Sequence, residues 1–272
     1  MSSNIARKNL VLSVASICVA VCSLAFVFSR SPFSGKGNLR PSFSADRTIP
    51  QLILWAWERP SDLSFIDPRK VGVAFLSRTI ILRGDHVVVQ PRRQSLKVPP
   101  GTSLTAVARI EIERNTEATL SQTQRLTLIS NLKEMANAPG LVAIQIDFDA
   151  KQSERAFYRE LLEDLKPELP PGIDLSITAL GSWCVGDRWL SALPVDDAVP
   201  MLFRMGPDSR QLHTRIEAQQ EFPEAKCRNS YGVSTDEPIE GLRTPRRIYA
   251  FSPHPWTNES LKSFLEKIEH EQ

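Results

Sequence analysis

Eight short, strongly apolar segments recur along the chain, and this repetition limits the folds open to it more than any other feature. Most of them are near-continuous apolar runs, the pattern of strands buried on both faces. Such strands belong to parallel sheets that are covered by helices. The predicted strands are 51–57, 71–82, 103–112, 141–149, 173–180, 198–205, 231–236 and 247–252.

Helix signals lie between several of these strands. Ser121 and Gln124 form a capping box ahead of apolar residues at helical spacing, and a second helix is predicted from Ser153 to Pro167. Further helices are predicted near 208–222 and 258–270. Strands that alternate with helices, without a Gly-rich phosphate turn after the first strand, favour a closed barrel over a doubly wound sheet.

The predicted fold class is therefore α/β, a (β/α)8 TIM-type barrel that is somewhat irregular. Residues 83–102 contain HVVVQPR and a PPG turn, which predict an extra hairpin in place of a helix. The link between the seventh and eighth strands is too short for a full helix.

The N-terminus predicts an exported protein. Arg7 and Lys8 precede an uncharged apolar run from Leu10 to Ser29 that approaches the length of a bilayer span. We expect residues 1–29 to be a signal anchor in the inner membrane that holds the body in the periplasm. The alternative is a cleaved signal peptide and a secreted protein. Residues 30–48 are predicted to be a flexible linker, which leaves 49–272 as a single barrel domain.

Charge and motifs exclude several classes of function. The chain has 33 basic and 31 acidic residues, and because both charges before Ser29 are basic, the body is neutral. No basic stripe is present, so we expect no nucleic-acid partner. The histidines at 86, 213, 254 and 270 lack metal spacing, and no P-loop or GxSxG elbow occurs, so we expect no metal and no cofactor.

The body contains two cysteines, Cys184 and Cys227. An oxidising compartment permits them to form a disulfide. Two separate buried thiols are the alternative, because sequence alone does not give the distance between them.

The ends of the predicted strands carry the candidate site residues, since a barrel of this kind places its active site at the C-terminal strand ends. All five tryptophans fall at or just past such ends. An indole offers a large flat apolar face with one polar N–H, which suits stacking against a sugar ring. The candidate substrate-binding residues are Trp57, Glu58, Trp183, Arg204, Asp236 and Trp256.

The fourth strand, LVAIQIDFD, carries the candidate catalysts. Because side chains alternate along a strand, Gln145, Asp147 and Asp149 share the face that points to the barrel axis. Inward acids at a strand end are candidates for general acid–base chemistry. Two alternatives stay open: the acids form internal salt bridges with Arg109 and Arg204, or Asp149 caps the following helix.

AIQIDFD resembles the strand-four signature of family 18 glycoside hydrolases, which are chitinase-like barrels. The resemblance implies that Asp149 takes the place of the Glu that protonates the glycosidic oxygen, and Asp147 that of the acid before it. This chain departs from the signature, because Asp149 is one methylene shorter than Glu and Gln145 cannot ionise.

A longer resemblance, to a bacterial domain-of-unknown-function family (number 3142), covers nearly all of the body. Its motifs occur here in order as LWAWERPSDLSFIDPRKVGVAFL, IDFDA, SITALGSWCVGDRWL, VPMLFRMGPD and GVSTDEP. The resemblance supports one domain and implies no activity.

The leading hypothesis is an envelope-located barrel of glycoside-hydrolase type that binds or cleaves a glycan or polysaccharide. Asp149 would be the general acid, Asp147 its like-charged neighbour, and Glu237 or the substrate itself would complete the displacement. The alternative is a non-catalytic binding or scaffold protein of the cell envelope, whose acids form internal salt bridges.

Overall fold

The computed structural model describes residues 49–114, 116–206, 209–237, 241–242 and 245–270. The predicted anchor and linker, residues 1–48, lie outside this part of the chain. None of the described helices combines the length and apolarity of a membrane span.

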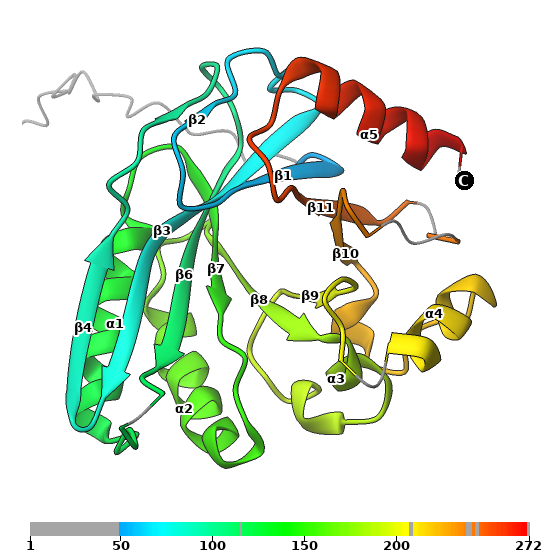
Figure 1. The fold of residues 1–272 in the computed structure, drawn as a ribbon. Helices are drawn as coiled ribbons and strands as arrows, with labels where there is room; N and C mark the ends of the chain where they lie inside the picture. Colours follow the sequence, from blue (N-terminus) through cyan, green and yellow to red (C-terminus); the bar gives the residue numbers. More distant parts are fainter. Residues whose placement is uncertain (1–48, 115, 207–208, 238–240, 243–244, 271–272) are drawn as a thin grey trace, which may run out of the picture. The chain divides into compact units, whose positions relative to one another are not determined.

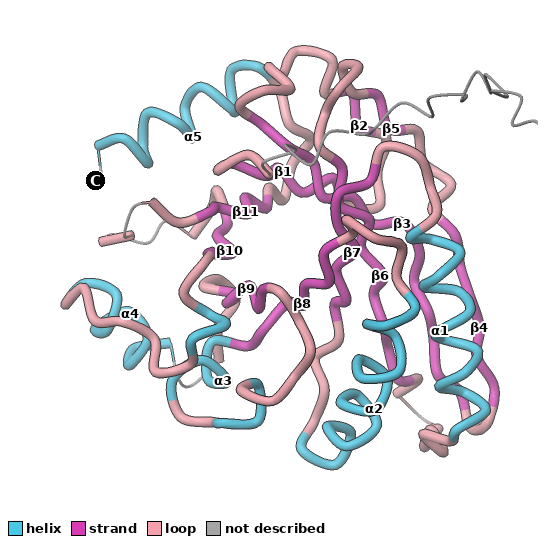
Figure 2. The backbone as a smooth tube through the Cα atoms, turned by 180° about the vertical axis from the view of Figure 1, so that it is seen from behind, coloured by secondary structure: helices cyan, strands magenta, loops and turns pink. Residues whose placement is uncertain are grey.

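The eight predicted strands are present, and they close into a parallel barrel (Figures 1 and 2). Each strand pairs in parallel with its neighbours, and β1 closes the ring by pairing with both β3 and β11. The barrel strands are β1 (Leu52–Ala56), β3 (Val71–Arg83), β6 (Leu104–Ile112), β7 (Leu141–Asp147), β8 (Asp174–Leu180), β9 (Asp197–Met201), β10 (Ser230–Ser234) and β11 (Arg247–Phe251).

Three strands end two or more residues earlier than the sequence predicts. β7 ends at Asp147, β9 at Met201 and β10 at Ser234, because the chain turns directly afterwards. The Ala150 N–H bonds to the Phe148 carbonyl, and Arg204 adopts a positive φ of 51°. Asp149, Arg204 and Asp236 therefore lie in the loops that follow the strands.

The predicted extra hairpin is confirmed. β4 (His86–Pro91) runs antiparallel to the second half of β3, while the short β2 (Ser61–Asp62) and β5 (Leu96–Lys97) pair with each other. β3 is 13 residues long, and only its first five residues pair with β1. The rest of β3, with β4 and β6, continues beyond the barrel as a three-stranded sheet (Figure 1).

Helices cover the outside of the ring (Figure 2). The capping box of α1 is confirmed: the Ser121 hydroxyl accepts from the Gln124 backbone N–H, and the Gln124 side-chain Oε1 accepts from the Ser121 backbone N–H. The described residues between β10 and β11 contain no helix. The helices are α1 (Gln122–Ala136), α2 (Arg155–Leu165), α3 (Gly181–Val185), α4 (Ser209–Glu217) and α5 (Asn258–His270), with 3-10 turns η1 (Gln152–Glu154), η2 (Lys166–Glu168), η3 (Arg188–Leu190) and η4 (Ala225–Cys227).

Apolar side chains form two cores, one on each side of the barrel wall. The larger lies between strands and helices and contains Ile144, Ile146 and Phe148. The smaller is a separate cluster of Ile53, Trp55, Ala74, Val107, Val199 and Tyr249, which lie on the inward face of their strands. The alternation predicted for the fourth strand is therefore present, and Gln145, fully buried inside, donates to the Ser176 hydroxyl of β8 at 3.3 Å.

A disulfide joins Cys184 of α3 to Cys227 of η4. The two residues are 43 positions apart, and both are buried. The link ties the segment after β8 to the segment before β10.

A buried acid, Asp197, lies at the start of β9. Asp197 accepts from the Ser230 hydroxyl at 2.8 Å and lies 3.8 Å from the Arg247 guanidinium. Burial raises the pKa of Asp197 to about 6, although the Ser230 hydrogen bond and Arg247 oppose the shift. In the unfolded chain an Asp titrates near 3.9.

We predict that the protein loses roughly 3 kcal/mol of unfolding free energy as pH rises from about 4 to about 6, because the unfolded chain releases this proton first. Asp197→Asn should remove that loss, since Asn still accepts from Ser230. Urea unfolding across this pH range measures it, with Glu163→Gln on the exposed face of α2 as control. Parallel pH profiles for wild type and Asp197→Asn would contradict the prediction.

Candidate functional site

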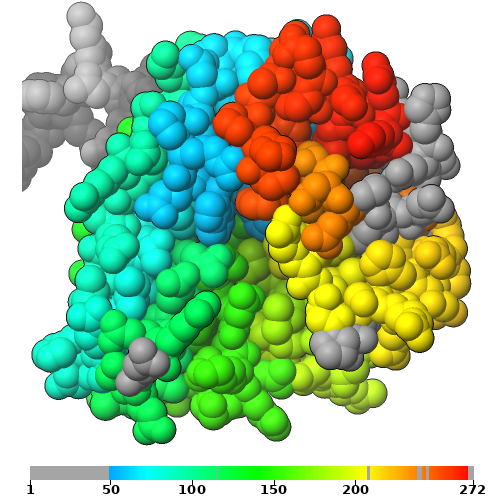
Figure 3. All heavy atoms as spheres, viewed as in Figure 1, coloured from blue at the N-terminus to red at the C-terminus, as the bar shows by residue number. Residues whose placement is uncertain are grey.

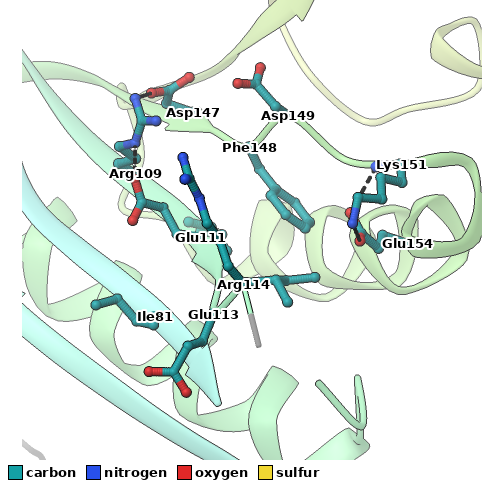
Figure 4. A pocket seen from close by; sticks show the side chains of 12 residues that line it. Ile81, Arg109, Glu111, Glu113, Arg114, Asp147, Phe148, Asp149, Lys151 and Glu154 are labelled. Atoms are coloured by element: carbon teal, nitrogen blue, oxygen red, sulfur yellow. Dashed lines mark hydrogen bonds and ion pairs between the residues drawn. The ribbon is translucent and has the colours of Figure 1, made fainter. Parts of the chain in front are cut away.

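A cavity of about 830 Å³ opens at the C-terminal ends of β6 and β7 (Figure 4). In the space-filling view, the green residues of this region lie between the cyan β3–β4 hairpin and the yellow segment that follows β8 (Figure 3). The apolar lining of the cavity comes from Phe148 and the isoleucines at 81, 110 and 112. Its charged side chains are Arg109, Glu111, Glu113, Arg114, Asp147, Asp149, Lys151 and Glu154.

Strand register brings the two sides of this cavity together. Arg109 of β6 lies opposite Asp147 of β7 in the parallel ladder. Glu111 lies two residues after Arg109, and Asp149 lies two residues after Asp147. Because side chains alternate along a strand, each lines the cavity on the same side as the residue two positions before it. The inward face predicted for the fourth strand therefore reaches an open space at its C-terminal end.

Asp147 is held firmly. Its side chain is 15% exposed, its Oδ1 accepts from the Thr178 hydroxyl at 2.8 Å, and its Oδ2 lies 3.4 Å from Arg109 Nη1. Burial raises the pKa of Asp147, opposed by the Arg109 charge and the Thr178 hydrogen bond and reinforced by Asp149. The internal salt bridge expected between this acid and Arg109 is present.

Asp149 has a different environment. It is exposed, and its carboxylate has no hydrogen-bond or ion-pair partner among the described residues. It does not cap the following helix, because Glu154 accepts from the Lys151 N–H at 2.7 Å in that place. Figure 4 shows the carboxylate at the cavity beside that of Asp147.

Arg109 joins the acids to an aromatic cluster. Its Nε lies 2.5 Å from Glu111 Oε1, and its guanidinium carbon is 5.5 Å from the centre of the half-buried Trp57 ring. Trp57 packs edge-on against Phe251, which stacks on Phe203 at 5.4 Å. The sequence analysis missed both phenylalanines, although they occupy the inward positions two residues beyond Tyr249 and Met201.

Three other predicted site residues form a separate cluster. Glu237 accepts from the Arg204 N–H at 2.8 Å and lies 3.4 Å from its Nε, while Asp236 accepts from the Arg204 guanidinium at 2.8 Å. The Ser234 hydroxyl donates to Asp236, and this hydrogen bond lowers the pKa of that acid. Arg204 therefore pairs with these acids, and not with Asp147 or Asp149 as one alternative expected.

Two residues predicted to bind substrate are instead core residues. Trp183 is 2% exposed and packs against Trp189, and Trp256 is 8% exposed and donates its indole N–H to the Trp55 carbonyl at 3.2 Å. Because protein covers both indoles, neither offers a face to a ligand. Glu58 is exposed just after β1 but does not line the cavity.

No group of three or more metal-ligating side chains occurs within the described ranges. The eight charged groups of the cavity are carboxylates and cations, with neither histidine nor cysteine among them. The donor set can hold and transfer protons, and it can bind polar or charged groups of a ligand.

Comparison with known proteins gives a family match over part of the chain. A sequence model described as Domain of unknown function (DUF3142) matches residues 101–205, which include Arg109, Asp147 and Asp149. The predicted resemblance to this family is confirmed over that range. None of the curated proteins matches the chain.

Two of the solved structures that are similar to this chain have low sequence identity. The Bacillus cereus spore cortex-lytic enzyme SleL is 18% identical, with a TM-score of 0.45, over 69% of this chain and 52% of that chain. The chitinase domain of the spore coat protein CotE from Clostridium difficile is 16% identical, with a TM-score of 0.37, over 66% of this chain and 57% of that chain. The chain spans less than two thirds of the length of either structure.

The different environments of the two acids predict different effects of their removal. Asp147→Asn should be at least as stable as wild type at pH 7, because Asn still accepts from Thr178 and removes a charge that burial disfavours. Asp147→Ala leaves Thr178 without its acceptor and should lose about 1–3 kcal/mol. Asp149→Asn should stay within about 0.5 kcal/mol of wild type.

Urea unfolding at pH 7 measures all three variants. A loss of several kcal/mol in Asp147→Asn would mean that the ion pair with Arg109 is a structural support, and would favour the scaffold hypothesis.

Proposed function

We propose that this barrel acts on a glycan and cleaves a glycosidic bond, with Asp149 as the general acid. The observation that carries the proposal is the carboxylate of Asp149, which is exposed at the acidic cavity with no partner in the described chain. Other acids of the cavity, Asp147, Glu111, Glu113 and Glu154, are engaged by protein groups. A free carboxyl at the end of a barrel strand is where proton transfer to a bound substrate is expected.

Asp147 supports this role through charge and position. It lies two residues before Asp149, and Thr178 and Arg109 fix its orientation. Burial and the nearby charge of Asp149 both raise the pKa of Asp147, so this site holds a proton more readily than a free Asp does. Such a site can deliver a proton to a glycosidic oxygen.

The displacement of the leaving group is assigned to the substrate itself. Both oxygens of Glu237 are engaged by Arg204, through its N–H and its guanidinium, which leaves this carboxylate poorly placed as a nucleophile. A neighbouring group on the sugar can displace the leaving group, which takes the proton of Asp149, without a second protein carboxylate; water then attacks the anomeric carbon of the cyclic intermediate and leaves a reducing end. The sequence analysis offered Glu237 or the substrate itself for the displacement, and this assignment takes the substrate.

Trp57, Phe251 and Phe203 provide a surface for sugar rings. All three rings are partly exposed, and Arg109, which bonds to Asp147, also lies over Trp57. Aromatic faces beside a charged site are typical of carbohydrate recognition, since C–H faces of a sugar stack on the ring and its hydroxyls reach the charges.

A second candidate function is glycan binding without cleavage, in an envelope scaffold protein. The ion pair between Arg109 and Asp147 favours it, because it engages one of the two acids. The neutral Gln145 below this pair favours it as well, since it cannot ionise. The two functions differ in whether new reducing ends appear when glycan is bound.

The general acid can be tested on purified protein with a panel of neutral and amino-sugar polysaccharides, with release of reducing ends as the assay. We expect Asp149→Asn to reduce the rate at least about 100-fold, since it cannot donate the proton. The matched control, Glu163→Gln on α2, should keep the wild-type rate. Equal rates in Asp149→Asn and wild type would remove Asp149 from the mechanism.

We also propose that the barrel lies outside the cytoplasmic membrane, anchored by residues 10–29 or released after cleavage. The disulfide between Cys184 and Cys227 supports this location, because such bonds persist in oxidising compartments. Protease added to spheroplasts should degrade the barrel while a cytosolic marker survives, and protection of the barrel would contradict the location.

A further inference from the structure

Not every charged side chain of the cavity has a hydrogen-bond or ion-pair partner among the described residues. Arg109 contacts both Asp147 and Glu111, and Lys151 pairs with Glu154. Glu113 is bound by Arg83 at 2.6 Å and by the Thr116 hydroxyl at 2.9 Å. Two charged groups of the lining remain without a hydrogen-bond or ion-pair partner in the described chain: the carboxylate of Asp149 and the guanidinium of Arg114 (Figure 4).

The backbone that carries Arg114 is well anchored. Arg114 follows the end of β6, where the Glu113 N–H donates to the Leu82 carbonyl at 3.0 Å and the Thr116 N–H donates to the Glu113 carbonyl at 3.3 Å. The Glu113 carboxylate adds its bonds to Arg83 and Thr116. Arg114 therefore starts from a fixed point on the sheet beyond the barrel, and Figure 4 shows its side chain extending into the cavity.

A free guanidinium carried by an anchored stretch of backbone is suited to one kind of ligand group. Its planar set of N–H donors matches the two oxygens of a carboxylate or a phosphate. Arg109 is not available for this purpose, because two carboxylates already occupy it. Pairing of Glu111 and Glu113 with their own cations also reduces the repulsion that an incoming anion would meet.

We infer that Arg114 binds an anionic substituent of the glycan, a carboxylate or a phosphate ester, while Asp149 faces the bond to be cleaved. The inference rests on the proposed function for the choice of a glycan. It makes this protein selective for acidic glycans, with Arg114 as the residue that recognises the charge.

The test measures binding in an Asp149→Asn background, so that no probe is consumed. The probes are a glucuronate-containing hexasaccharide of hyaluronan, its carboxyl-reduced neutral form, and an oligomannoside that carries mannose 6-phosphate. We expect at least one anionic probe to bind about tenfold more tightly than the neutral hexasaccharide. Arg114→Gln should abolish this preference, and Arg114→Lys should keep part of it.

Arg93→Gln is the matched control, because Arg93 is exposed after β4 and does not line the cavity. It should keep the full preference, and thermal melting should confirm that all variants are folded. Preference for the carboxylated probe identifies an acidic sugar as the source of the anion, and preference for the phosphorylated probe identifies a phosphate ester. The inference fails if no anionic probe binds Asp149→Asn more tightly than it binds the protein that also carries Arg114→Gln.

These outcomes are independent of catalysis. A preference that depends on Arg114, in a protein that releases no reducing ends, would leave the inference intact and remove the proposed cleavage. Cleavage of neutral glycans by the wild type, together with no preference for any anionic probe in Asp149→Asn, would do the reverse.

Discussion

Closure of the ring by β1 is the constraint on which the rest of this structure depends. Once β1 pairs with both β3 and β11, every strand has one face toward the helices and one face toward a space that solvent does not fill. A polar residue on the inward face must then find a partner on a neighbouring strand or reach the mouth. Three pairs of side chains follow this rule: Asp197 with Ser230, Gln145 with Ser176, and Asp147 with Thr178. Asp149, two residues beyond Asp147, is exposed at the mouth instead.

Much of this architecture can be predicted from the spacing of apolar residues and from the capping and turn residues between the apolar segments. The eight apolar runs, the capping box at Ser121 and the hairpin before Gly101 are local signals, and each was predictable because it depends on neighbours in sequence. The inward direction of Asp147 and its pairing with Arg109 were also predictable. Alternation fixes the first, and adjacency of the third and fourth barrel strands limits the partners for the second.

The remaining features depend on tertiary geometry. Position at a strand end does not tell which way an indole turns, so Trp183 and Trp256 could not be separated from Trp57, the one that stays at the mouth. Arg204 itself adopts a positive φ, and in this conformation its side chain pairs with Asp236 and Glu237. The spacing of Cys184 and Cys227 in the sequence does not give the distance between them in space. Whether they form a disulfide depends on how the segments after β8 and before β10 pack.

The long pairing between β3 and β6 gives the barrel a rim of unequal height. β3 continues for eight residues past its last contact with β1, which at about 3.3 Å per residue is an excess of roughly 25 Å on one side. A linear polymer therefore cannot lie flat across the mouth in that direction, and must run alongside the raised edge or end against it. The height of one strand thus limits the orientations in which a long chain can reach Asp149, before any side chain distinguishes one sugar from another.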